Sequence, residues 1–136
     1  MNKSDLIAIR SVRPEDMNFI YASWLRGLYY GDSVFSLVPK QIFMSNYHKV
    51  LDFLLKSNNT EITVACLKDD PEVILGYAVL SKNPRTLHYV FVKKQWRSIG
   101  IAKGLIPGDI NVATHFTKVG FSIMNKKGWT YNPFIS

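Results

Sequence analysis

The hydrophobic period of the sequence changes near Asn58-Asn59, and this change limits most strongly the folds that the chain can adopt. Through most of the sequence before it, apolar residues recur at the three- and four-residue spacing of an amphipathic helix. After it, they follow the two-residue spacing of a half-buried strand. Two helices followed by a run of short strands predict a mixed α/β layer with an antiparallel meander in the middle of the chain.

The helical half begins and ends at recognisable signals. A helix is predicted over residues 14–29, because Pro14 and the two acids after it favour the first turn and the positive end of the helix dipole. Gly31-Asp32-Ser33 breaks this helix. A second helix is predicted to start at Pro39 and to end at Asn58-Asn59.

Four segments have the pattern of strands, and the middle two are joined by a polar turn typical of a hairpin. These segments are Leu6–Val12, Glu61–Leu67, Val73–Ser81 and Leu87–Lys93. A short helix is predicted to begin near Ser98 and must end by Pro107, because proline lacks the helical donor.

The last 30 residues allow two divisions. In the first, a strand over Ile110–Phe116 precedes a helix capped by Thr117, and an extended piece follows over Trp129–Phe134. In the second, a short helix ends at Gly120, and Phe121–Met124 forms a hairpin with the same final piece. The first division is preferred.

Composition indicates an intracellular globular protein. Its 136 residues, with 47% hydrophobic and 20% charged, fit one domain over 1–136. The single Cys66 forms no internal disulfide, and no signal-peptide pattern or apolar run of membrane-spanning length is present. We therefore expect a cytoplasmic protein that makes no membrane contact and needs no metal. The net charge of +7 favours anionic ligands without choosing among them.

One segment has the features of a phosphate site. The strand over Leu87–Lys93 runs into a basic turn, and the following helix opens with Gly100 and Ala102. The first turn of a helix leaves N–H groups without internal partners, and small residues let an oxyanion approach them. Arg97 and nearby lysines add full positive charges. The segment therefore predicts a pyrophosphate site.

At this point the sequence resembles a known family. Val92-Lys-Lys-Gln-Trp-Arg-Ser-Ile-Gly-Ile-Ala102 is similar to motif A of the GNAT superfamily of N-acetyltransferases, Val-x-x-x-[aromatic]-[Arg/Gln]-x-x-Gly-x-[Gly/Ala]. Ile9–Asp16 and Val64–Val79 resemble earlier parts of the same fold, so the similarity covers about Leu6–Ile106. The resemblance implies a GNAT-like three-layer α/β (α+β) fold, with a mixed, mostly antiparallel central sheet and helices on both faces. The part after Pro107 is shortened relative to this family.

The resemblance also implies a division of labour around acetyl-CoA (coenzyme A). The strand edge would pair with the pantetheine arm, the following loop would bind the pyrophosphate, and a backbone N–H near Val90 would hold the oxyanion. A bulge in the fourth strand would separate it from the fifth and admit the thioester. The residues expected to bind the cofactor are Val90, Phe91, Val92, Arg97, Ser98, Ile99, Gly100, Ile101, Ala102 and Lys103.

The catalytic residues do not follow from the resemblance. The family often places a tyrosine acid in a Tyr-x-x-x-Gly-Phe pattern, but here Phe116 occupies that position. His115 and Tyr131 are candidate substitutes, and His88 is a candidate base because histidine titrates near neutral pH. Each has a structural alternative: a strand or helix cap for His115, a core tyrosine for Tyr131, and a side chain turned into the helix layer for His88.

Three functions remain open. The first is transfer of an acetyl group from acetyl-CoA to a primary amine of an unknown acceptor by direct attack. The second is a GNAT-like CoA-binding protein with altered catalysis. The third is a basic module that binds nucleic acid, although no nucleic-acid motif supports it. Its cations would be Lys93, Lys94, Arg97 and Lys103, and either Trp96 or the group of Trp24, Tyr29 and Tyr30 would stack on bases. The short helix before Pro107 leaves the acceptor side either open or completed by a second subunit in a homodimer.

Overall fold

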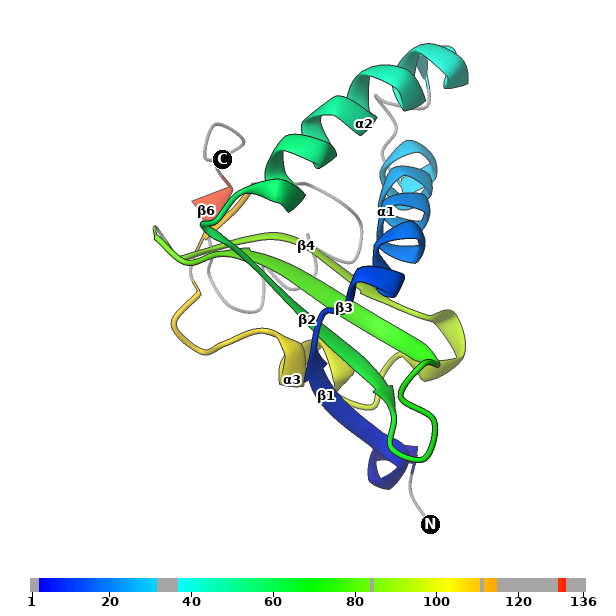
Figure 1. Ribbon diagram of the computed structural model, residues 1–136, viewed down its shortest axis with the longest axis vertical. Helices are drawn as coiled ribbons and strands as arrows, with labels where there is room; N and C mark the ends of the chain where they lie inside the picture. The colour runs from blue at the N-terminus through cyan, green and yellow to red at the C-terminus, as the bar shows by residue number, and fades with distance from the viewer. Residues whose placement is uncertain (1–2, 32–36, 84, 111, 115–129, 132–136) are drawn as a thin grey trace.

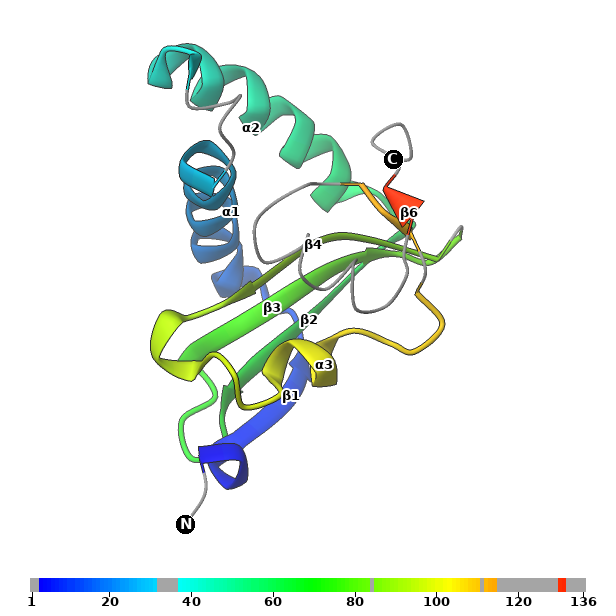
Figure 2. The ribbon, with the colours of Figure 1, turned by 180° about the vertical axis from the view of Figure 1, so that it is seen from behind.

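The computed structural model describes residues 3–31, 37–83, 85–110, 112–114 and 130–131. In these residues a six-stranded sheet is the centre of the molecule, with its strands in the order β1-β2-β3-β4-β5-β6. Helices α1 and α2 cover one face of the sheet and α3 lies on the other (Figures 1 and 2). This arrangement confirms the predicted three-layer fold.

The helices and strands lie close to the predicted segments over most of the chain. The strands are β1 (Ile7–Ser11), β2 (Thr60–Leu67), β3 (Ile74–Ser81), β4 (Thr86–Val92), β5 (Val112–Ala113) and β6 (Thr130–Tyr131). The helices are α1 (Met17–Gly31), α2 (Lys40–Lys56) and α3 (Ile101–Leu105), with 3₁₀ turns at Lys3–Leu6, Pro14–Asp16 and Lys94–Trp96. None of the helices in the described part of the chain has the length and apolar character needed to cross a bilayer.

The first four strands form an antiparallel meander, and the last two are added in parallel. The β1–β2 register runs from Ile7 opposite Leu67 to Ser11 opposite Thr63. The β4–β5 and β5–β6 pairs are both parallel. The sheet is therefore mixed and mostly antiparallel, as the sequence predicted.

Two apolar cores lie on opposite faces of the sheet. The core under α1 and α2 contains Trp24, Leu51 and Tyr77, all with no exposed surface. The core under α3 contains Leu75, Leu80 and Leu105 among other aliphatic side chains. Because every residue of β3 is buried, this strand has the continuous apolar character of one covered on both faces.

An ion pair fixes the start of α1 against β1. The carboxylate of Asp16 accepts hydrogen bonds from both Arg10 Nη atoms, at 2.7 and 2.9 Å, and from the backbone N–H of Arg13 at 2.7 Å. The Arg10 hydrogen bond is the main cause that lowers the Asp16 pKa. Arg10 also donates to the carbonyl of Pro71, so one side chain joins β1, the helix entry and the β2–β3 turn.

The end of the chain is described only in part. Strand β5 lies inside the predicted strand Ile110–Phe116, and β6 lies inside the predicted extended piece Trp129–Phe134. The predicted helix after Thr117 and the alternative hairpin at Phe121–Met124 fall outside the described residues.

Candidate acyl-CoA site

Strand β5 pairs with β4 near the start of β4. The described register has the pair Leu87–Ala113, supported by a 3.1 Å hydrogen bond from Thr114 N–H to the Leu87 carbonyl. Among the described residues, no strand residue pairs with His88–Val92 on the side away from β3. This is the part of β4 where the resemblance implies an opening between the fourth and fifth strands.

The pairing of β4 with β3 determines which backbone groups of β4 point toward β3 and which point away from it. Lys93 N–H donates to the Leu75 carbonyl at 2.8 Å, and antiparallel strands direct alternate residues toward alternate neighbours. Tyr89 and Phe91 therefore bond to β3, while the N–H and C=O groups of Val90 and Val92 point away from β3. These are the strand residues that the resemblance assigned to the pantetheine arm.

A bulge in β4 lies next to the Leu87–Ala113 pair. Val79 pairs with Tyr89 but Leu80 pairs with Leu87, so His88 is the extra residue between the two pairs. A bulge bends its strand and redirects the side chain it carries. This bulge agrees with the feature that the resemblance implied for the fourth strand.

His88 is buried at this bulge and bonded on both sides. Its Nε2 lies 2.6 Å from Ser81 Oγ and its Nδ1 lies 2.8 Å from Thr114 Oγ1. Burial lowers the pKa of His88 to about 4, so the ring is neutral at pH 7. Both ring nitrogens already contact hydroxyl groups, an arrangement suited to holding strands together; its predicted role as a base stays a prediction.

The loop after β4 has an unusual backbone. Ser98 has a φ of 67° and Gly100 a φ of 90°, with Ile99 between them in the ordinary negative range. Alternating signs of φ turn successive N–H groups toward one side and produce an anion-binding concavity. Gly100 has no β-carbon and adopts its left-handed conformation without steric cost, whereas Ser98 does not have this freedom.

This backbone also corrects the predicted start of the third helix. The helix was expected near Ser98 but begins at Ile101, with Gly100 as its N-cap. Two residues with left-handed backbone conformations cannot lie inside a right-handed helix. The residue types at the predicted helix start do not indicate these conformations, so the sequence placed the start too early. The helix is consequently only five residues long.

The N–H groups of the loop are free to bind a ligand. Within the part of the chain that the structure describes, the hydrogen bonds of the loop give no acceptor to any backbone N–H from Ser98 to Lys103. The carbonyls of Gly100 and Ala102 are instead used by Gly104 and Ile106. Ser98, Gly100 and Lys103 are exposed, and the first turn of any helix leaves its N–H groups without internal partners, so these groups can bond to solvent or to an anion.

The basic residues of this segment divide between two faces. Arg97 Nε donates to the Val92 carbonyl at 3.0 Å and so ties the loop to the end of β4. Lys93 instead places its ammonium group 5.4 Å from the centre of the Phe19 ring, on the α1 side of the sheet. Lys3 donates to the Gln95 carbonyl and lies over Trp96, which packs on the α3-side core.

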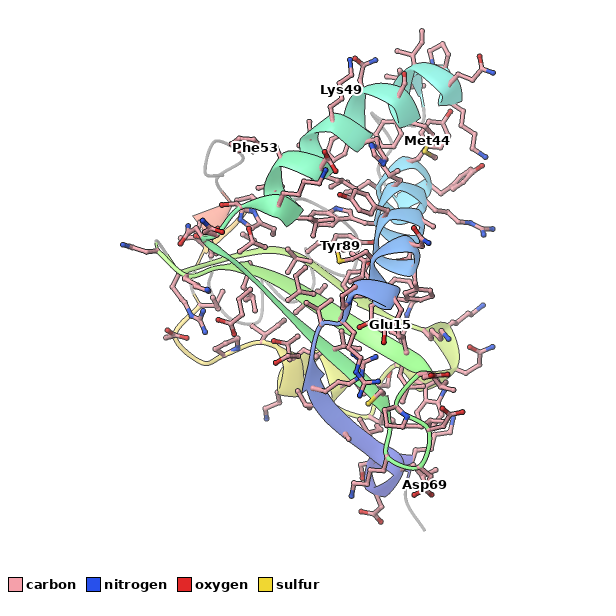
Figure 3. All side chains as sticks on the ribbon, viewed as in Figure 1. Glu15, Met44, Lys49, Phe53, Asp69 and Tyr89 are labelled. Atoms are coloured by element: carbon pink, nitrogen blue, oxygen red, sulfur yellow. The ribbon has the colours of Figure 1, made fainter. Side chains whose placement is uncertain are left out.

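The α1 side of β4 is lined by aromatic rings. Tyr89 points toward α1 (Figure 3), and its ring stacks on Trp24 with centroids 5.0 Å apart. Tyr77 and Phe91 continue this layer. Burial raises the pKa of Tyr89 to about 12, so the hydroxyl stays protonated at physiological pH.

The other two predicted catalytic residues remain untested. His115 lies outside the described residues, as does Phe116. Tyr131 lies in β6, with its backbone in register with Ala113. Sequence reasoning missed Ser81 and Thr114 as partners of His88, because isolated hydroxyl residues carry no signal until the strands bring them together.

Comparison with solved structures identifies the fold. The chain is similar to a provisionally named acetyl transferase from Pyrococcus furiosus, with 13% identity, 96% and 97% of the two chains covered, and a TM-score of 0.67. It is also similar to a predicted acetyltransferase from Clostridium acetobutylicum with acetyl-CoA, with 15% identity, 96% and 94% coverage, and a TM-score of 0.63. This likeness shows that the chain has the GNAT acetyltransferase fold.

A third structure extends the comparison. The aminoglycoside N-acetyltransferase AAC(6′)-Iy, in complex with CoA, is 14% identical, with 96% and 91% of the chains covered and a TM-score of 0.55. The sequence itself matches no protein-family model and no curated protein. The similarity is thus one of structure, at sequence identities well below those that define a family.

Proposed function

We propose that this protein is an acyl-CoA-dependent N-acyltransferase that transfers an acetyl group from acetyl-CoA to a primary amine. The observation that carries the proposal is the continuity of two backbone surfaces. The edge of β4 that faces away from β3 leads directly into a loop in which the N–H groups of residues 98–103 have no acceptor among the described residues. A ligand with an amide-bearing arm and a pyrophosphate fits this succession.

Two parts of the chain, β4 and the loop after it, would bind different parts of acetyl-CoA. Val90 and Val92 would pair through their backbone with the amides of pantetheine, as a neighbouring strand would. The N–H groups from Ser98 to Lys103 would bind the pyrophosphate, and the Arg97 guanidinium lies at the junction of the two surfaces. The net charge of +7 favours the approach of such an anion.

The proposed reaction is a direct transfer. Bound acetyl-CoA supplies a thioester carbonyl. The acceptor nitrogen forms a bond to the carbonyl carbon as the carbon–sulfur bond breaks, the amine loses a proton, and the thiolate of CoA gains one. The N–H of Val90, directed away from β3, would stabilise the negative charge on the carbonyl oxygen. His115, Tyr131 and His88 stay the predicted proton-transfer residues.

A CoA-binding protein without transfer activity is the second candidate function. It is favoured by Phe116, which stands where the family often has its tyrosine acid. A nucleic-acid module is less well supported, because Lys93 turns to Phe19 instead of joining Arg97 and Lys103 in one basic surface.

Thermal unfolding in the presence of acetyl-CoA tests binding. A ligand that binds only the folded state adds about 2.7 kcal/mol of stability at 100 times its dissociation constant, so millimolar acetyl-CoA is expected to raise the Tm clearly. No shift would contradict both candidate functions. Release of CoA thiol with a panel of primary amines then separates a transferase from a binding protein.

Two glycines in this segment provide a matched pair of variants. Gly100→Ala places a β-carbon at a φ of 90°, which favours a changed backbone in the loop. Gly104→Ala lies in α3, where a β-carbon meets nothing within 4 Å. We expect Gly100→Ala to lose most of the acetyl-CoA shift and Gly104→Ala to keep it. Equal shifts in the two variants would place the phosphate site elsewhere.

A further inference from the structure

A cleft lies between the start of α1 and the sheet, on the face opposite α3. Its volume is about 390 Å³, which is in the range of small-molecule sites. The residues that line it come from four separate parts of the chain: the end of β1, the start of α1, the turn before β3 and the residue after β4. All of these residues are among those that the structure describes.

The cleft has an apolar floor and a fixed ion pair in its wall. Phe19 and Ile74 line it and also belong to the core under α1 and α2. The carboxylate of Asp16 and the guanidinium of Arg10 lie 2.7 Å apart, and Arg10 donates further hydrogen bonds to the Pro71 carbonyl. Because these two charges already neutralise each other, the charge that a ligand meets comes from the other lining residues.

Two cations and two acids around the cleft complete its lining. Arg13 and Glu15 come from the segment that leads into α1, Glu72 from the β2–β3 turn, and Lys93 from the end of β4. Within the described part of the chain, none of the four forms an ion pair. A ligand with charge of one sign would attract two of these groups and repel the other two, whereas a ligand with both signs complements all four.

We propose that this cleft binds a free amino acid with an apolar side chain, at a site separate from the acyl-CoA site. The carboxylate of the amino acid binds the cations Arg13 and Lys93, and its ammonium group binds the carboxylates of Glu15 and Glu72. Its side chain packs on the apolar floor of the cleft. The match is one of charge sign, apolar surface and size, all of which are set by described residues.

The cleft is not placed to supply the acceptor amine of the proposed reaction. Lys93 is three residues beyond Val90, which corresponds to about 10 Å of strand. The two acids that hold the ammonium group lie still further from the edge of β4 that faces away from β3, because one is at the start of α1 and the other is in the β2–β3 turn. A bound amino acid is therefore a second ligand, and the inference does not depend on the proposed function.

Titration of the full chain with amino acids, followed by two-dimensional amide NMR spectra, tests the inference. The probes are L-leucine, L-methionine and L-phenylalanine, together with L-leucinamide, which lacks the carboxylate, and 4-methylpentanoate, which lacks the ammonium group. We expect at least one of the amino acids to shift the amide signals of Phe19, Ile74 and Lys93 to saturation. L-Leucinamide and 4-methylpentanoate should each bind about tenfold more weakly than L-leucine, because each loses charge-assisted hydrogen bonds.

Two matched pairs of variants assign the ligand's charges to the cleft. Glu72→Gln should weaken L-leucine binding about fivefold and leave 4-methylpentanoate unchanged, since that analogue has no ammonium group. Lys93→Met should weaken L-leucine and 4-methylpentanoate but not L-leucinamide. Asp69→Asn, in the same turn as Glu72, and Lys94→Met, next to Lys93, lie outside the cleft and should bind L-leucine as the unmodified protein does. Figure 3 shows Asp69 at the far end of the β2–β3 turn, away from the start of α1.

The other outcomes overturn the inference. It is wrong if none of the three amino acids gives saturable shifts, if the shifts lie only on the α3 face of the sheet, or if L-leucine and its two analogues bind equally well. An equal loss of L-leucine affinity in the control variants would show a general effect of charge instead of a site in this cleft. Absence of acetyl-CoA binding, measured separately by thermal unfolding, would contradict the proposed function and leave this inference standing.

Discussion

At the scale of single residues, the candidate site depends on backbone conformations that the sequence does not predict. Ser98 has a β-carbon in the left-handed region, at a φ of 67°. Non-glycine residues in that region carry steric strain, and such strain concentrates at functional sites. The Ser98 side chain is exposed, so packing does not explain why serine stands there.

The strain at Ser98 predicts a stabilising substitution. Ser98→Gly removes the β-carbon and should raise the free energy of unfolding by about 1 kcal/mol, after the added freedom of the unfolded chain is counted. Ser98→Ala is the matched control, because it removes the hydroxyl but keeps the β-carbon and should bring no gain. Urea unfolding of both variants measures the difference. Equal stability would argue against a left-handed residue 98.

The neutral state of His88 predicts how stability depends on pH. Its pKa is about 4 in the folded protein against 6.5 for the free side chain, so the unfolded state binds more protons between these values. Stability is therefore expected to fall as pH drops from 6.5 to 4, by up to about 3 kcal/mol. Asp16, whose pKa is lowered, adds a further loss only below 3.8.

Denaturant unfolding between pH 7 and 4 tests this pH dependence. His88→Gln has no titrating ring and should lose the part of the pH dependence between 6.5 and 4. If both proteins show the same curve over that range, His88 is not the neutral buried group described above.

At the scale of elements, the position of β4 depends on a glycine in the neighbouring strand. A β-carbon at Gly76 would lie 2.5 Å from the Phe91 carbonyl oxygen and 3.3 Å from Val92 Cα. Both contacts are with backbone, which cannot move away by changing a rotamer. Gly76 therefore allows β3 to approach the part of β4 that forms the proposed cofactor edge.

Gly76→Ala should consequently affect both stability and binding. We expect the free energy of unfolding to fall by about 1–3 kcal/mol, as for other overpacked positions, and acetyl-CoA affinity to weaken because β4 is displaced. Gly108→Ala, where a β-carbon meets nothing within 4 Å, is the control. Differential scanning calorimetry with and without acetyl-CoA gives both effects. A fully tolerated Gly76→Ala would contradict the close approach of the strands.

Element by element, the sequence predicted the segments with a strong hydrophobic period. The first two helices and the four meander strands were found to within a few residues, because burial of one face imposes a repeat that is visible in the residues themselves. The third helix was placed too early, since its start depends on φ at Ser98 and Gly100. Strand β5 lies inside the predicted strand Ile110–Phe116, but its parallel pairing with β4 leaves little local signal in the sequence.

At the scale of the whole molecule, the candidate site arises from how the strands are connected. The meander from β1 to β4 pairs neighbours in sequence, while β5 joins after a long connection and in parallel. The site lies at this change of connection. The phosphate loop over Arg97–Ala102 could be proposed from the sequence because its residues are consecutive. The hydrogen-bonded group of Ser81, His88 and Thr114 could not, because these residues meet only in the folded sheet.

The alternation of β4 backbone groups between two sides predicts an uneven pattern of amide hydrogen exchange. Tyr89 and Phe91 bond to β3 and should exchange slowly, whereas the amides of Val90 and Val92 have no strand partner among the described residues and should exchange faster despite their buried side chains. Acetyl-CoA should then slow exchange at Val90 and Val92 alone within this strand. If the exchange rate alternates along β4 and becomes uniform when acetyl-CoA is added, the ligand takes the place of a neighbouring strand at this edge.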